Sequence, residues 1–232
     1  MSIEIPPVGP GRDAGTAAKL QILATEHWSL LATRTLTYNE ALSRVTIFLS
    51  ILSGTLIALA LVAQADHFGA IFISIAIPLL ALVMFAAIIT VSRLTALNGD
   101  DYRWVIGMNR LRHAYVDLHP ELEQYFITSP YDDLPGALQT LGIEATAGRR
   151  LLGSIFHVPQ TLPGMLTVIV AAVAGAIGAL AALAIGIPPL AIGLAAAAVF
   201  VLALVLMWIW NRRRIKRSPP SLEPRFPSPR SG

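Results

Sequence analysis

The chain has 232 residues, of which 55% are hydrophobic and only 13% are charged. A soluble globular domain usually has about a quarter of its residues charged, so this composition argues against an ordinary soluble domain. The absence of cysteine excludes disulfides, thiolate metal sites and a catalytic thiol. The formal net charge of +3 comes from a basic C-terminal cluster, and we interpret it as a sign of membrane topology before nucleic-acid binding.

The N-terminal part of the chain has two sections. Residues 1–15 are rich in Pro and Gly and are predicted to be a disordered lead. Residues 16–44 have apolar side chains such as Leu20, Leu23 and Leu30 on one helical face, which is typical of an amphipathic helix. Because no Gly or Pro separates it from the first apolar run, we expect one long helix that enters the membrane.

Four apolar runs dominate the chain: residues 45–65, 68–92, 162–187 and 190–210. Each approaches or exceeds the roughly 20 residues that cross a hydrocarbon core as a helix. None contains an acidic or basic residue or a histidine. A backbone in lipid must satisfy its own hydrogen bonds, so the runs are predicted to be transmembrane helices. They form two pairs, hairpin 1 at 45–92 and hairpin 2 at 162–210.

Small residues recur at four-residue spacing in two of these runs. Such faces let another helix approach closely in lipid. We therefore predict helix packing, and assembly into a homo-oligomer, at two sets of positions. They are Ser50, Gly54 and Ala58 in the first run, and Gly175, Gly178 and Ala182 in the third.

The central segment, residues 93–161, is polar and is predicted to be helical. Residues 100–118 have an apolar helical stripe, and Pro120 and the pair Asp132-Asp133 stand where further helices should begin. Residues 149–157 are typical of a short amphipathic helix on the membrane face. The predicted fold is therefore all-α: a polytopic membrane protein with four transmembrane helices in two hairpins and a helical cytoplasmic segment.

Basic residues predict the orientation. They flank the apolar runs at both termini and in the centre, while the two short turns have none. The positive-inside rule then places both termini and the centre in the cytoplasm, with the spans in the cell inner (plasma) membrane. The main anchor is a cluster at the start of residues 211–232, which are otherwise Pro-rich and predicted to be disordered: Arg212, Arg213, Arg214, Lys216 and Arg217. Beyond anchoring topology, this cluster could bind anionic lipid. Nucleic acid is not expected, because no aromatic residues are interleaved with the cluster.

The central segment also supplies the candidate metal ligands. His113 and Asp117 are one helical turn apart, and Asp132-Asp133, like Asp100-Asp101, is a pair of adjacent carboxylates. No established ligand spacing is matched, and acids at helix starts are explained by capping, which is the favoured interpretation. No phosphate-binding loop or catalytic arrangement is found, so no catalytic residue and no cofactor is predicted.

Two stretches carry a resemblance to known proteins. Residues 26–40, with the sequence EHWSLLATRTLTYNE, and residues 104–113 together with Tyr115 resemble bacterial multi-span integral membrane proteins of no known activity. A long amphipathic helix that continues into a two-span hairpin also resembles, faintly, the two-span effector modules of bacterial defence systems, which implies action on membranes. The second hairpin departs from that pattern.

The leading functional hypothesis is a non-enzymatic membrane protein that self-associates as a pore or a scaffold. It depends on the small-residue faces and on the lack of a catalytic arrangement. Two alternatives stay open. One is a membrane-bound enzyme with its site in the acidic cytoplasmic centre. The other is a small-solute carrier, which is disfavoured because no ionisable residue lies within an apolar run.

Overall fold

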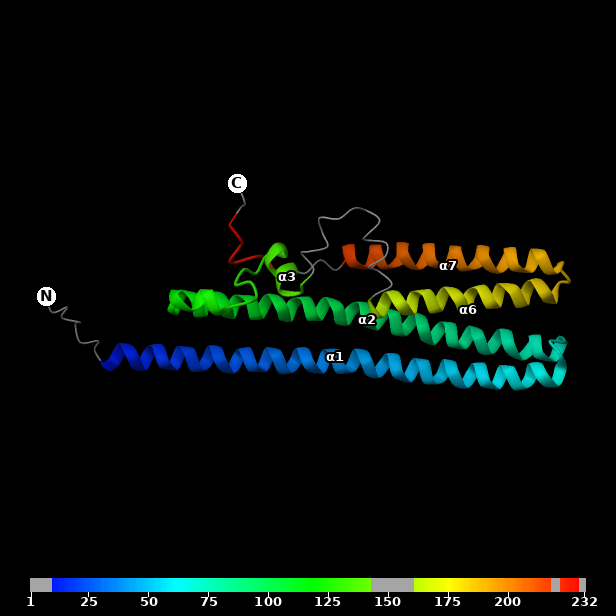
Figure 1. Ribbon diagram of the computed structural model, residues 1–232, viewed down its shortest axis with the longest axis horizontal. Helices are drawn as coiled ribbons and strands as arrows, with labels where there is room; N and C mark the ends of the chain where they lie inside the picture. The colour runs from blue at the N-terminus through cyan, green and yellow to red at the C-terminus, as the bar shows by residue number, and fades with distance from the viewer. Residues whose placement is uncertain (1–9, 143–160, 218–221, 230–232) are drawn as a thin grey trace. The chain divides into compact units, whose positions relative to one another are not determined.

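A computed structural model describes residues 10–142, 161–217 and 222–229, and within these ranges every regular element is helical (Figure 1). The elements are α1 (Pro10–Asp66), α2 (Ala70–Leu118), the 3₁₀ helix η1 (Pro120–Tyr125), α3 (Leu134–Thr140), α6 (Leu162–Ala184) and α7 (Pro189–Arg217). Four of them, α1, α2, α6 and α7, are long and apolar enough to cross a membrane. The all-α class and the four apolar helices are therefore confirmed.

The two longest helices are each continuous across a change in composition. α1 joins the amphipathic stretch to the first apolar run, as predicted. α2 joins the second apolar run to the helix expected at residues 100–118, so Asp100 and Asp101 lie inside a helix and do not begin one. That prediction was wrong because Gly99 was the only break signal, and a single glycine costs a helix only about 1 kcal/mol. Pro78 also lies inside α2 without ending it.

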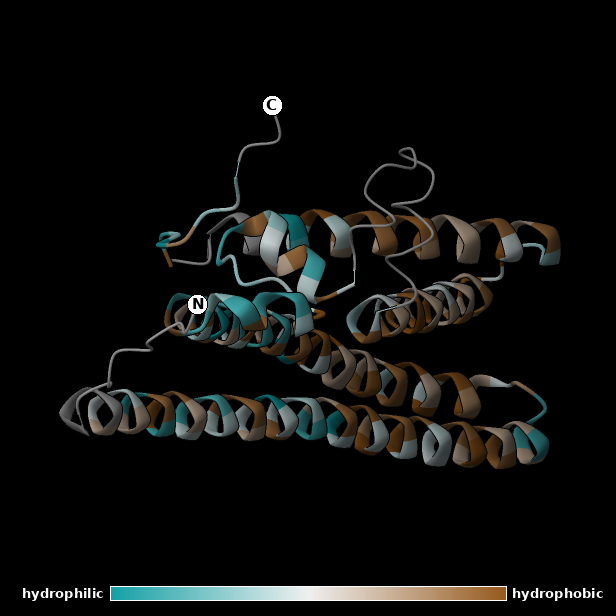
Figure 2. Ribbon diagram, turned by 60° about the vertical axis from the view of Figure 1, so that its left-hand side comes forward, coloured by the Kyte–Doolittle hydropathy of each residue, from teal (hydrophilic) through white to brown (hydrophobic). Residues whose placement is uncertain are grey.

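The chain forms two compact units. The apolar unit comprises residues 38–99 and 149–219, and the polar unit comprises residues 1–37, 100–148 and 220–232. Figure 2 shows that hydrophobic residues dominate α6 and α7, whereas hydrophilic residues gather on α3 and on the first part of α1. The predicted amphipathic helix at residues 149–157 lies outside the described residues.

The core of the apolar unit is built from all four long helices. Phe48 of α1, Val83 and Val91 of α2, Leu166 of α6 and Met207 of α7 belong to one buried cluster. A second cluster joins α1, α2 and α6. Many large apolar side chains of this unit nevertheless face outward, and the most apolar stretch of α7 has no buried residue. Such a surface fits a lipid environment and would be unfavourable in water.

An ion-pair network lies just before the first apolar run and just after the second. The Arg93 guanidinium donates to both carboxylate oxygens of Glu40, at 2.9 and 3.0 Å, and Arg44 donates to the same carboxylate at 2.8 Å. This network joins α1 to α2. A bidentate pair of this kind adds orientation as well as attraction.

Candidate functional site

The polar unit contains a buried acidic pair in the loop that leads into α3. Asp133 caps α3, because its side chain accepts a hydrogen bond from the backbone N–H of Gly136 at 2.9 Å. This confirms the predicted capping role. Asp132, the residue before the cap, is only 1% exposed. A buried carboxylate needs several donors to replace the water that it has lost.

The C-terminal tail supplies most of the donors to Asp132. The backbone N–H groups of Arg225 and Phe226 donate to its two carboxylate oxygens at 2.9 and 2.7 Å. The Arg110 guanidinium of α2 donates at 2.6 Å. In return the Asp132 N–H donates to the Phe226 carbonyl at 3.1 Å, so the loop and the tail pair through their backbones as well.

Asp133 binds the same tail one step further along. One carboxylate oxygen of Asp133 accepts hydrogen bonds from the Ser228 N–H, at 2.8 Å, and from the Ser228 hydroxyl. The other oxygen serves the α3 cap. A single acidic residue thus both starts a helix and holds a segment 95 positions away in sequence.

Apolar contacts and a further hydrogen bond complete the tail contacts. The Phe226 ring stacks on the His113 imidazole with the ring centroids 4.1 Å apart. Leu222 packs against a small core that contains Val105 and Ile106. The Arg110 guanidinium also donates to the Glu223 carbonyl at 2.8 Å. We call Arg110, His113, Asp132 and Asp133 the tail-binding site, and residues 222–228 the tail segment.

Buried polar residues hold the loop of this site in place. Asn109, which is fully buried, donates to the Tyr131 carbonyl at 2.7 Å and accepts from Thr140 at 2.9 Å. Gly136 leaves room for the loop, because a Cβ there would lie 2.3 Å from the Tyr131 carbonyl oxygen. These contacts between the loop, α2 and α3 do not involve the tail.

The tail also changes the acidity of the two carboxylates. Burial alone raises the pKa of Asp132, but the N–H groups of Arg225 and Phe226, together with Arg110, more than offset this and hold that pKa below its usual value. Burial likewise raises the pKa of Asp133, but the Ser228 and Gly136 donors bring it below the usual range. Both groups are thus kept as anions, the form that accepts hydrogen bonds from the tail.

The candidate metal ligands are placed as follows. His113 Nε2 lies 3.7 Å from an Asp117 carboxylate oxygen within α2. Asp132 and Asp133 bind the tail segment, while Asp101 pairs with Arg34 of α1 at 2.6 Å and Asp100 lies 3.8 Å from Arg103. Across the described ranges, no group of three or more His, Asp or Glu is close enough to hold a metal ion.

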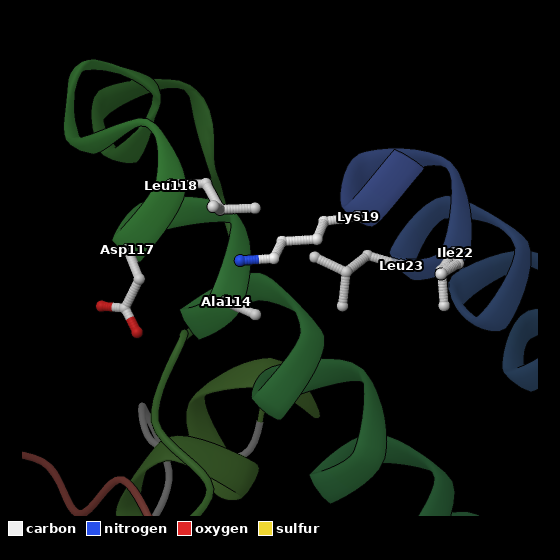
Figure 3. Close-up of a pocket in the computed structure, with 6 residues that line it drawn as sticks. All are labelled: Lys19, Ile22, Leu23, Ala114, Asp117 and Leu118. Carbon is white, nitrogen blue, oxygen red and sulfur yellow. The ribbon is translucent and has the colours of Figure 1, made fainter. Parts of the chain in front are cut away.

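A shallow hollow of about 340 Å³ lies between the two long helices of the polar unit (Figure 3). The Lys19 side chain extends from α1 toward Ala114 and Leu118 of α2, and Asp117 does not point at its ammonium group. The rest of the lining is apolar. Its polar groups do not converge on one point, so the hollow lacks the arrangement that orients a ligand.

The predicted packing glycines lie in different environments. In α6, a Cβ added at Gly175 would lie 3.1 Å from the Ala196 carbonyl oxygen, and one at Gly178 would lie 2.8 Å from Val199. Both glycines therefore allow α7 to approach, and Ala182 is buried. In α1, no atom of the described residues would lie within 4 Å of a Cβ at Gly54, and Ser50 and Ala58 are exposed.

The predicted basic anchor belongs to α7, which continues as a helix to Arg217. The Arg212 guanidinium lies 4.5 Å from the centre of the Trp208 ring, in a cation–π contact. Arg213 is exposed. The side chains of Arg214, Lys216 and Arg217 lie outside the part that the structure describes.

The tail-binding site was missed by sequence reasoning, which treated residues 211–232 as disordered. In the structure, α7 continues to Arg217, and residues 222–229 follow a defined path. One signal was present: Arg225 and Phe226 stand among the prolines and serines of the tail.

Comparison with protein-family models, with curated proteins and with solved structures found no match.

Proposed function

We propose that this chain is a non-enzymatic, multi-pass membrane protein that self-associates in the plasma membrane and acts as a scaffold. Its four spans form two hairpins, and both termini and the central segment face the cytoplasm. The observation that carries the self-association is the open small-residue face of α1, which contains Ser50, Gly54 and Ala58.

Contacts within the polar unit support this topology. The tail segment binds Asp132 and Asp133 of the central segment, and Arg34 of α1 pairs with Asp101. Residues that form such bonds must share one aqueous compartment. The proposed topology puts them in one compartment, because two spans separate the N-terminal helix from the centre. Two more spans separate the centre from the tail.

The contrast between α6 and α1 supports self-association. A glycine on a lipid-facing helix contributes to stability only where another helix packs closely against it. The glycines of α6 are matched by α7, whereas no described residue lies within 4 Å of a Cβ built on Gly54. A second copy would match the α1 face by the same close packing.

The chemistry of this face favours a scaffold over a pore. The Ser50 hydroxyl donates to the Thr46 carbonyl at 2.9 Å, within its own helix. A serine whose hydroxyl proton is already used within its own helix presents a small surface for packing. It has one donor fewer for a hydrogen bond to water. The face therefore suits a dry helix–helix contact.

Counting subunits in lipid nanodiscs by native mass spectrometry tests the proposal. The wild type should give an oligomer, and Gly54→Ile should weaken the association at least tenfold because its branched side chain blocks close approach. Ala60→Ile adds a similar side chain to another exposed face of α1 and should leave the oligomer unchanged. A monomeric wild type, or an unaffected Gly54→Ile variant, would refute self-association through this face.

A further inference from the structure

We propose that the tail-binding site is a recognition site for extended peptides, that the chain's own tail segment occupies it as a reversible latch, and that a peptide with the same chemistry competes for it. The inference does not depend on self-association. The tail-binding site and the tail segment both belong to the polar unit.

The positions of the prolines match the pattern of backbone donors. Asp132 and Asp133 accept hydrogen bonds from the N–H groups of residues 225, 226 and 228. The intervening and flanking positions are Pro224, Pro227 and Pro229, which have no N–H to offer. The segment therefore keeps a donor at each position where the site has an acceptor. Its prolines also stiffen it, which lowers the entropy lost on binding.

Two side chains and the charge of the site add specificity. Phe226 stacks on His113, and Leu222 enters the small apolar core, so the site selects an aromatic and an aliphatic residue four positions apart. The two carboxylates outnumber Arg110 by one charge. The fitting ligand is thus an extended segment with backbone N–H donors for the two carboxylates and with proline between its donor positions, as in the sequence LEPRFPS.

The geometry of the tail segment favours release. Glu223, Pro224, Arg225, Pro227 and Pro229 are exposed, so the segment lies on the surface and is not threaded through the fold. The loop and helices that form the site are held by Asn109 and by the α3 cap, neither of which involves the tail. The site can therefore stay formed when the tail segment leaves.

A competition experiment with the full-length chain in nanodiscs tests the latch. The probe is a fluorescent synthetic peptide with the sequence of residues 222–232, followed by anisotropy. Combined Phe226→Pro and Ser228→Pro substitutions disable the chain's own tail by removing three donors to the carboxylates and the Phe226 ring. Ser221→Pro is the matched control, because it adds a proline outside the tail segment and removes none of the donors to the carboxylates.

The tail-disabled chain should bind the probe at least tenfold more tightly than the wild type or the control, because a tethered tail competes at a high effective concentration. Adding Asp132→Asn should abolish this binding, and a probe with the same two prolines should not bind. Equal, weak binding to all chains would overturn the proposal. Loss of helical circular dichroism in the tail-disabled chain would also overturn it, since the tail would then be part of the fold.

Discussion

Replacing Asp132 with Asn should release the tail segment. The carboxylate accepts from Phe226 through one oxygen and from Arg110 and Arg225 through the other. An amide has one acceptor oxygen, so whichever way it is oriented its NH₂ group faces at least one donor. The variant therefore loses one or two hydrogen bonds and the charge that strengthens the rest.

The size of the effect follows from the burial of the site. The Asp132 side chain is fully buried, so water screens its hydrogen bonds only weakly. A hydrogen bond to a charged group contributes about 1.5–3 kcal/mol. A loss of about 2–3 kcal/mol corresponds to a roughly 30- to 150-fold larger population of the undocked tail, at 1.4 kcal/mol per factor of ten.

Hydrogen exchange of the Phe226 amide in nanodiscs measures this population, because the amide exchanges only when the tail leaves the carboxylate. We expect the exchange to be about 30- to 150-fold faster in Asp132→Asn. Asp100→Asn is the control, since Asp100 lies 3.8 Å from Arg103 in an exposed pair, and it should change nothing. A Phe226 rate within about threefold of the wild type, with the Gly136 amide still protected, would refute the reasoning.

Three further predictions follow from the same contacts. Acid should undock the tail: docking lowers the pKa of both carboxylates, so its stabilisation is complete above their ordinary pKa of about 4 and is lost as the pH falls through the lowered values. The Ser228 amide chemical shift should then change as the pH falls below about 4. Gly136→Ala should destabilise α3 by about 1–3 kcal/mol, because its Cβ would lie 2.3 Å from a backbone oxygen, and unchanged exchange in α3 would contradict this. Gly178→Leu should separate α6 from α7, because Val199 lies 2.8 Å from the added Cβ; a lower melting temperature in detergent is expected, with no change in Gly193→Leu, where the space is open.

Local patterns in the sequence determined the helices and several of their ends. Four long runs without a charge predict helices because a backbone in lipid must close its own hydrogen bonds, and this requirement acts within each segment. The same local logic predicted Asp133 as a cap and Pro120 as the start of η1, and both are confirmed. It failed at Asp100, where a plausible cap lies inside α2, because neighbouring residues did not interrupt the helix.

Only the tertiary structure decided what the polar residues do. Asp132 and Phe226 are 94 positions apart, and their bond joins a side chain to a backbone N–H that nearly every residue possesses. A backbone donor cannot be recognised from composition or periodicity. A Pro-rich tail that binds a partner site therefore has the same local sequence pattern as a Pro-rich tail that binds nothing. For the same reason the sequence could place small residues on α1 and α6, but only the structure shows that α7 covers Gly178 while no described residue approaches Gly54.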